Sequence, residues 1–239
     1  MGLRVVSLVP SATESLLAWD ITPVAVTRFC EQPALLAVGG TKDPDVDAVI
    51  ALHPDLVVLC EEENRSEDAA ALTAAGLATH VIRIDSVEDV EPELERLAAA
   101  VGVDRAPVEA MPPPAAATTM TALVPIWRRP WMTVSGGTYG SSVLAHLGIA
   151  NVFAGAATRY PVFDFEEAAA LAPDVVIAPS EPYPFGERHR DELEQLAPVV
   201  FVDGQDLFWW GVRTPSALAR LGAQLDPVRA SRSSRPRTA

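Results

Sequence analysis

The sequence has few cysteines and a shortage of positive charge. Its two cysteines, Cys30 and Cys60, are too few for a disulfide framework or for a zinc site built from cysteine pairs. Lysine and arginine total 18 against 32 acidic residues, so the formal net charge is -14. A surface that neutralises nucleic-acid phosphates must be basic. Nucleic acid is therefore excluded as the main partner.

No export signal or membrane span is recognised in the sequence. Met-Gly-Leu-Arg leads directly into a strand pattern, without a basic region, a long apolar stretch or a small-residue cleavage site. A cytoplasmic location is therefore expected, and a periplasmic or extracellular one would require that the N-terminus had been trimmed. With 239 residues, 49% of them hydrophobic, the chain is long enough to bury a sizeable core.

What the chain does contain is an internal repeat. Residues 45–61 have an acidic start, a short apolar helix, a Pro-Asp break and a β-branched run, and residues 164–180 repeat that order. Upstream of these segments, residues 7–21 align without a gap to residues 135–149. The same order of elements occurring twice predicts two similar lobes.

The fold class expected from this pattern is α/β. Strands alternate with helices in both halves, which predicts two Rossmann-like lobes with mainly parallel sheets covered on both faces. Ser11 and Glu14 have the spacing of a capping box at the start of the first helix. Pro107 and the triple proline 112–114 cannot lie inside a regular helix, which leaves the continuity of the connector helix open. The predicted parts are an N-terminal lobe, a helical connector, a C-terminal lobe and a disordered tail, at residues 1–85, 86–121, 122–225 and 226–239.

Aromatic residues are scarce but gather where a ligand is expected. Ligands of open parallel sheets bind at the carboxyl ends of the strands, and two lobes that present such edges to each other predict a cleft. Aromatic residues are only 6% of the chain, yet many fall on these edges, and Thr27-Arg28-Phe29 is matched by Thr158-Arg159-Tyr160. Rings in such loops are typical of a site for a flat or apolar ligand. The residues predicted to bind it are Ser11, Arg28, Phe29, Cys30, Thr41, Lys42, Glu62, Asn64, Tyr139, Tyr160, Tyr183, Phe208, Trp209, Trp210 and Arg213.

Several segments together resemble a known family. Residues 4–14 (Arg-Val-Val-Ser-Leu-Val-Pro-Ser-Ala-Thr-Glu), 26–33 (Val-Thr-Arg-Phe-Cys-Glu-Gln-Pro) and 39–45 (Gly-Gly-Thr-Lys-Asp-Pro-Asp), with both Pro-Asp strands, are similar to the class III periplasmic-binding-protein-like family. This family comprises the vitamin B12 and iron-siderophore binding proteins of the helical-backbone metal receptor superfamily. The resemblance spans residues 4–222.

The resemblance implies two α/β lobes bridged by a long helix and a ligand that is cobalamin, haem or a ferric chelate. The protein would need no cofactor beyond this ligand, and it would deliver the ligand to the permease of an ABC importer. Importer docking in the family uses an acidic residue on each lobe. Glu67 or its neighbours would serve on the first lobe, whereas the corresponding loop of the second is Phe208-Trp209-Trp210-Gly211.

Three side chains leave other chemistry open. Cys30 and Cys60, at neighbouring strand ends, and His189, in a loop, are the candidate metal ligands, although two small buried side chains and a solvated histidine are the favoured interpretation. An enzyme would place these groups or Glu62 around a bound chelate or small metabolite. A ligand-sensing or partner-docking module would instead use the aromatic loops to bind another protein. The function predicted here is binding of a metal chelate by a monomer, without catalysis.

Overall fold

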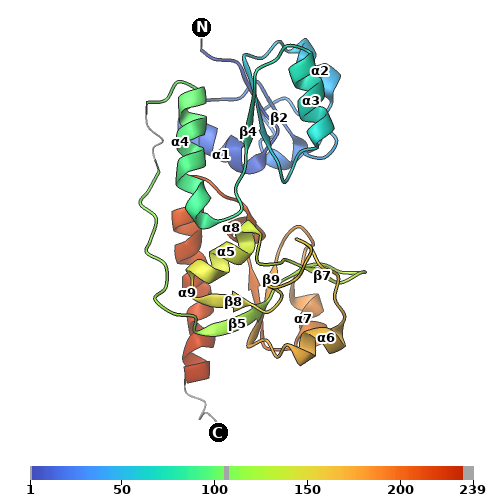
Figure 1. Ribbon diagram of the computed structural model, residues 1–239, viewed down its shortest axis with the longest axis vertical. Helices are drawn as coiled ribbons and strands as arrows, with labels where there is room; N and C mark the ends of the chain where they lie inside the picture. The colour runs from blue at the N-terminus through green and yellow to red at the C-terminus, as the bar shows by residue number, and fades with distance from the viewer. Residues whose placement is uncertain (1, 105–107, 234–239) are drawn as a thin grey trace. The chain divides into compact units, whose positions relative to one another are not determined.

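The computed structural model describes residues 2–104 and 108–233 (Figure 1). These residues form two compact units, each built from more than one stretch of the chain. The first unit consists of Met1–Ile84, Glu88–Glu109 and Trp210–Val212. The second consists of Asp85–Val87, Ala110–Trp209 and Arg213–Ala239.

The first unit is built on a parallel sheet of four strands in the order β2-β1-β3-β4. Its strands are β1 (Val5–Ser7), β2 (Ala25–Val26), β3 (Leu56–Cys60) and β4 (Thr79–Ile82). Its α-helices are α1 (Pro10–Ala18), α2 (Val46–Ala51), α3 (Ser66–Ala74) and α4 (Val90–Ala100), and the 3-10 turns here are η1 (Arg28–Cys30) and η2 (Val87–Asp89).

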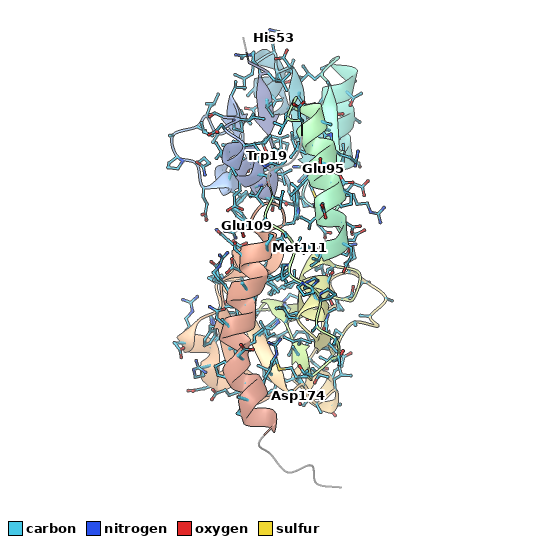
Figure 2. All side chains as sticks on the ribbon, turned by 90° about the vertical axis from the view of Figure 1, so that its left-hand side faces the viewer. Trp19, His53, Glu95, Glu109, Met111 and Asp174 are labelled. Carbon is cyan, nitrogen blue, oxygen red and sulfur yellow. The ribbon has the colours of Figure 1, made fainter. Side chains whose placement is uncertain are left out.

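Both faces of this sheet are covered. Val57 and Leu59 of β3 pack with Val49 of α2 and Leu72 of α3 in one core cluster. The alternate residues of β3 point to the opposite face and are also buried, as expected for a central parallel strand. Figure 1 shows α2 and α3 on one side of the sheet and α1 and α4 on the other. Figure 2 labels Trp19, which ends α1, and Glu95 on α4.

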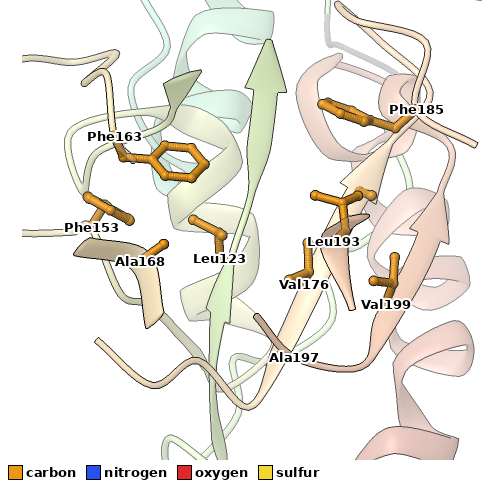
Figure 3. Packing of buried hydrophobic residues seen from close by; sticks show 10 residues of the cluster. Leu123, Phe153, Phe163, Ala168, Val176, Phe185, Leu193, Ala197 and Val199 are labelled. Atoms are coloured by element: carbon orange, nitrogen blue, oxygen red, sulfur yellow. The ribbon is translucent and has the colours of Figure 1, made fainter. Parts of the chain in front are cut away.

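The second unit has the same strand order. Its strands β5 (Met120–Leu123), β8 (Ile149–Asn151), β9 (Val175–Pro179) and β10 (Val199–Val202) lie parallel in the order β8-β5-β9-β10. Its helices are α5 (Tyr139–His146), α6 (Phe165–Ala170), α7 (Arg190–Leu193), α8 (Gly204–Phe208) and α9 (Thr214–Ser233), with the 3-10 turn η3 (Glu187–His189). Figure 3 shows its core, in which Leu123, Val176 and Val199 of the strands pack with Leu193 and Phe153. The predicted α/β fold class is confirmed.

The sequence repeat is visible in the backbone contacts. Asp45 and Asp164 start the repeated helices, and each accepts a hydrogen bond from the backbone N–H three residues on, at 2.9 and 2.8 Å. Eight residues after these caps, His53 and Ala172 both have left-handed backbone conformations, with φ of 46° and 47°. The two repeated helices therefore end in the same turn geometry.

The aspartates of the two Pro-Asp breaks also share one role. Asp55 accepts a hydrogen bond from the Arg4 amide at 2.8 Å, and Asp174, labelled in Figure 2, accepts one from the Thr121 amide at 2.7 Å. Each aspartate therefore ties the start of its own strand to the neighbouring strand. These contacts make β5 the equivalent of β1.

One local prediction, at the start of the first helix, is wrong. This helix begins at Pro10 with Val9 as its N-cap and no side-chain cap, so Ser11 and Glu14 form no capping box. Proline at the first helical position starts the helix two residues too early for Ser11 to cap it. A strand is present within residues 131–134, as β7 (Met132–Thr133), and it pairs with β6 (Pro125–Trp127) in an antiparallel hairpin between β5 and α5.

Among the described residues of the connector predicted at 86–121, helix α4 ends at Ala100. Residues 108–119 contain no helix, and His146 of α5 contacts the part of this segment that belongs to the second unit. The His146 Nε2 atom lies 2.8 Å from the Pro112 carbonyl oxygen, and the Ala115 amide donates to the His146 carbonyl at 2.8 Å. Pro107 lies outside the described residues.

The disordered tail predicted from residue 226 is wrong as far as Ser233. Helix α9 continues through Pro227 to Ser233. Three buried side chains along it stabilise the helix by packing: Leu218, Leu221 and Leu225. The low apolar content of the sequence after residue 225 did not indicate that the helix would continue. Residues 234–239 lie outside the described part of the chain.

Candidate functional site

Asn64 joins three segments at the carboxyl ends of the strands in the first unit. Its side-chain nitrogen donates to the carbonyl oxygens of Leu8 and Thr41, at 3.2 and 2.9 Å, and its side-chain oxygen accepts from the Cys60 amide at 2.8 Å. The residue is buried. Asn64 therefore fixes the loops that follow β1 and β3 against the loop containing Thr41.

The loop around Thr41 is held by two cationic side chains. The Lys42 ammonium donates a hydrogen bond to the carbonyl oxygen of Glu62, a residue that follows β3. Arg28, which follows β2, pairs with Asp43 at 3.0 Å. Both basic side chains are exposed but already bonded within the unit, so their first role is to shape this edge.

Phe29 presents its ring to solvent beside these contacts. Its side chain is 48% exposed, and the Arg28 guanidinium carbon lies 4.7 Å from the centre of its ring. The next residue anchors the turn, because the buried Cys30 sulfur lies 3.3 Å from the Thr13 hydroxyl and 3.2 Å from the Thr27 hydroxyl. A rigid turn therefore carries an accessible aromatic side chain.

The remaining candidates of this unit differ in accessibility. Ser11 is buried in the first turn of α1, and its carbonyl oxygen accepts from the Ser15 hydroxyl at 3.0 Å. Thr41 and Glu62 are partly exposed, and both offer backbone carbonyl oxygens to the contacts of Asn64 and Lys42. Ser11 thus contributes to the scaffold, whereas Thr41 and Glu62 lie at its surface.

Cys30 and Cys60 are both buried free thiols. Burial, and next the nearby charge of Glu63, raise the pKa of Cys60 to about 12, so its thiolate is scarce at neutral pH. Among residues 2–104 and 108–233, no group of three or more histidine, cysteine or acidic side chains could hold a metal ion.

In the second unit, Tyr139 is buried, whereas Phe208 is partly exposed and packs on a glycine of the same helix as Tyr139. Tyr139 is buried, and its hydroxyl lies 2.9 Å from that of Thr214. Burial raises the pKa of this phenol. A side-chain carbon added to Gly140 would lie 2.7 Å from the Phe208 ring, so Phe208 packs directly on that glycine. The glycine at this position is needed for close packing.

Trp209 and Trp210 are adjacent but belong to different units. Trp209 ends α8 and is partly exposed, with the guanidinium of Arg213 5.2 Å from its ring centre. Trp210 is only 4% exposed. In the same short segment, Gly211 has φ of 112°, and a side-chain carbon there would meet the Ser15 hydroxyl of α1. Trp209 is therefore the accessible ring of the pair.

Tyr160 has surroundings that match those of Phe29. Its side chain is 39% exposed, in the loop that follows β8. The preceding arginine, Arg159, pairs with Asp85 at 2.9 Å, as Arg28 pairs with Asp43 in the first unit. Each repeat thus carries an exposed aromatic side chain directly after an arginine that the fold has already paired.

Tyr183 and His189 lie in an aromatic cluster of the second unit. The Tyr183 ring contacts Phe185, with centres 4.8 Å apart, and His189 at 5.5 Å. His189 was expected to lie in a solvated loop, but it is 5% exposed. Burial, and next the charge of Arg188, lower its pKa. Tyr183 also contacts Trp127 edge-on and is partly exposed.

Sequence reasoning missed several polar residues that shape these edges. Asn151 ends β8 and donates to the Val134 carbonyl at 2.8 Å and to the Ser141 hydroxyl at 3.2 Å. Asp206 of α8 is buried and accepts two hydrogen bonds from Arg220. No sequence signal distinguished Asp206 from a surface residue.

Within the part of the chain that the structure describes, no helix is long and apolar enough to cross a membrane.

The chain is similar to curated vitamin B12-binding proteins. The relative from Salmonella choleraesuis is 25% identical over 194 residues, covering 73% of this chain and 71% of the relative. The relative from Vibrio parahaemolyticus is 26% identical over 190 residues, covering 72% and 69% of the two chains. These relatives are named as binding proteins and not as enzymes.

Solved structures of periplasmic binding proteins share the fold. The vitamin B12 binding protein BtuF of Vibrio cholerae superimposes with a TM-score of 0.75 at 19% identity, over 95% of this chain and 97% of that one. A heme-binding protein from Pseudomonas aeruginosa gives a TM-score of 0.76 at 22% identity, over 95% and 94% of the two chains. At such identities the likeness establishes the fold.

These comparisons correct the expected location. The protein was expected to be cytoplasmic because no export signal was recognised in its sequence, and that expectation is wrong. The solved structures that share the fold, the B12-binding and the heme-binding examples alike, are of periplasmic proteins.

The family itself is established over most of the chain. The model of the periplasmic binding protein family matches residues 5–197, which include the sheet strands β1 to β4 of the first unit and β5, β8 and β9 of the second. The suspected resemblance to such proteins is confirmed by this match and by the curated relatives. The chain therefore belongs to the periplasmic binding protein family.

Proposed function

We propose that this protein binds a large metal chelate of the cobalamin or haem type, without catalysing a reaction on it, and passes it to the permease of an ABC importer. The observation that carries the proposal is the matched exposure of Phe29 and Tyr160, one on each repeat. Exposed rings on rigid turns offer apolar area to a flat ligand at little cost in conformational entropy.

The loops around Phe29 support this role. The contacts of Asn64, Lys42 and Cys30 hold the edge in shape without the ligand, which is typical of a largely preformed site. Related chains named for vitamin B12 binding favour cobalamin as the first ligand to test. Structures titled as heme-binding proteins make haem the second.

The alternative of an enzyme has gained no support from the candidate groups. Cys30 and Cys60 are buried thiols, and the raised pKa of Cys60 is the opposite of what a thiolate nucleophile requires. His189 is buried among aromatic rings and not exposed at a strand end. Binding therefore remains the proposed function.

The test is titration of the purified protein with cyanocobalamin, haemin and a ferric siderophore, followed by absorption spectroscopy. Phe29→Ala and Tyr160→Ala are each expected to weaken binding roughly tenfold, because a ring that the ligand buries contributes about 1–3 kcal/mol. Leu171→Ala is the matched control, since Leu171 is 43% exposed and precedes β9, at the opposite end of the strands. Saturable binding that both ring variants weaken would support the proposal. Absence of binding to all three ligands would overturn it.

A further inference from the structure

The sequence predicted that Arg213 binds the ligand. We propose that Arg213 is a positioning residue: its guanidinium supports the Trp209 ring for stacking against the ligand and does not contact the ligand itself. The proposal rests on the proposed function, because it assigns Trp209 to the surface that the ligand covers.

The Arg213 guanidinium is already surrounded by protein groups. Its carbon lies 5.2 Å from the centre of the Trp209 ring, and one of its nitrogens donates to the Gln205 side-chain oxygen at 3.2 Å. A second nitrogen lies 3.9 Å from the Asp206 carboxylate. The Arg213 side chain is only 15% exposed, so little of its charge is accessible to a ligand.

The backbones of both residues are fixed by the two helices that they adjoin. The Trp209 amide donates to the Gln205 carbonyl at 2.9 Å, at the end of α8. The Arg213 carbonyl accepts from the Ala217 amide at 2.8 Å and from the Ser216 hydroxyl at 3.0 Å, at the start of α9. The ring and the guanidinium therefore have fixed main-chain anchors, and Trp209 remains partly exposed for a ligand.

Asp206 does not require Arg213 as its main counterion. Its two carboxylate oxygens accept hydrogen bonds from Arg220 at 2.7 and 2.6 Å, much shorter than the 3.9 Å to Arg213. The position of the guanidinium over the Trp209 indole ring is thus the better explanation for an arginine at position 213. A planar guanidinium stacks on an aromatic face in a way that the compact ammonium of lysine does not.

One experiment without ligand tests the support of the ring directly. The chain has five tryptophans, so the emission of Trp209 is taken as the difference between each protein and the same protein carrying Trp209→Phe. Arg213→Met and Arg213→Lys are expected to raise acrylamide quenching of Trp209 about twofold, because the covered ring face becomes accessible. Unchanged quenching in variants that remain folded by circular dichroism would overturn the inference. If Arg213→Met does not fold, the same quenching measurement is made on Arg213→Lys and on Gln205→Leu. The second of these variants removes one hydrogen bond to the guanidinium.

A second experiment uses cyanocobalamin titration. Arg213→Met and Arg213→Lys are each expected to weaken binding roughly tenfold, the effect of losing a well-supported stacking ring. In a Trp209→Ala background the same changes should alter affinity less than about twofold. Arg128→Met is the matched control, since Arg128 lies over the ring of Trp131 at 5.9 Å, outside the proposed contacts, and its loss should leave affinity unchanged.

The outcomes separate this inference from the proposed function. If Arg213→Lys keeps full affinity, the guanidinium is not needed to support the ring and the inference is wrong. If Arg213→Met weakens binding equally in the Trp209→Ala background, Arg213 acts independently of the ring and the inference is also wrong. If the unmodified protein binds neither cyanocobalamin, haemin nor a ferric siderophore, the proposed function fails. The quenching experiment then decides the role of Arg213 alone.

Discussion

At the scale of single residues, the candidate side chains fall into those that shape a strand-end loop and those that remain accessible. Asn64, Cys30 and Tyr139 are buried and bonded, whereas Phe29 and Tyr160 are exposed. A residue type in a loop does not reveal this difference, because it depends on which neighbours the rest of the chain brings to that loop. Polar residues with two or three internal bonds fix the loop backbone, and the exposed rings depend on that backbone.

Cys60 provides a prediction on pH. Its pKa rises from an ordinary 9.0 to about 12 in the folded protein, with burial as the main cause. Between these values the unfolded chain binds fewer protons than the folded one, so stability falls as pH rises above about 9. Urea titrations at pH 8 and 10.5 should show a larger loss of stability for the unmodified protein than for Cys60→Ala. Equal losses in the two proteins would contradict the buried, protonated thiol.

At the scale of elements, the repeat was well predicted from the sequence and the insertions were not. The Asp caps and Pro-Asp breaks are short-range signals, and they placed β3 and β9 correctly. The hairpin of β6 and β7 has no counterpart among the described residues of the first unit, and the sequence indicated a strand at residues 131–134 but not its antiparallel pairing. Strand partners depend on contacts far along the chain, which a local pattern of β-branched residues does not specify.

The site was less predictable than the fold for the same physical reason. Phe29, Tyr160, Trp210 and Tyr139 have similar sequence surroundings, since each lies near glycine, threonine or arginine. Only the first two are exposed, because α9 covers Tyr139 through Thr214 and the first unit buries Trp210. Both covering contacts come from segments distant in sequence.

The two Pro-Asp breaks support a prediction on stability. Asp174 accepts hydrogen bonds from both the amide and the hydroxyl of Thr121, at 2.7 and 2.9 Å, and is partly buried. Asp55 accepts from the Arg4 amide and is exposed. Asp174→Ala should therefore lower the free energy of unfolding by about 1–3 kcal/mol, and Asp55→Ala by about 1 kcal/mol or less. Urea denaturation measures both values.

The matched control for each aspartate is asparagine, which keeps a carbonyl oxygen as acceptor but removes the charge. Asp174→Asn should lose less stability than Asp174→Ala. A result in which the asparagine variant is as unstable as the alanine variant would show that charge, and not the bond to the strand amide, is what the repeat conserves at this turn.

At the scale of the whole molecule, each unit has a core cluster of its own, although the chain passes between the units more than once. Leu72 is fully buried in the core cluster of the first unit, and Leu193 is fully buried in that of the second. Neither core cluster contains residues of the other unit. This arrangement is typical of units that open separately under native conditions.

Amide hydrogen exchange tests whether the units open separately. Leu72→Ala should cost about 2–5 kcal/mol locally and speed exchange in β1, β3 and β4 by at least tenfold, while β5 and β9 change little. Leu193→Ala should have the reverse effect, because its cavity removes packing from the cluster that includes residues of β5, β9 and β10. Faster exchange in both units after either substitution would mean that the chain unfolds as one cooperative body. A substitution in either core would then destabilise the strand-end loops of both units. A loss of ligand affinity in such a variant would not show which unit had been weakened.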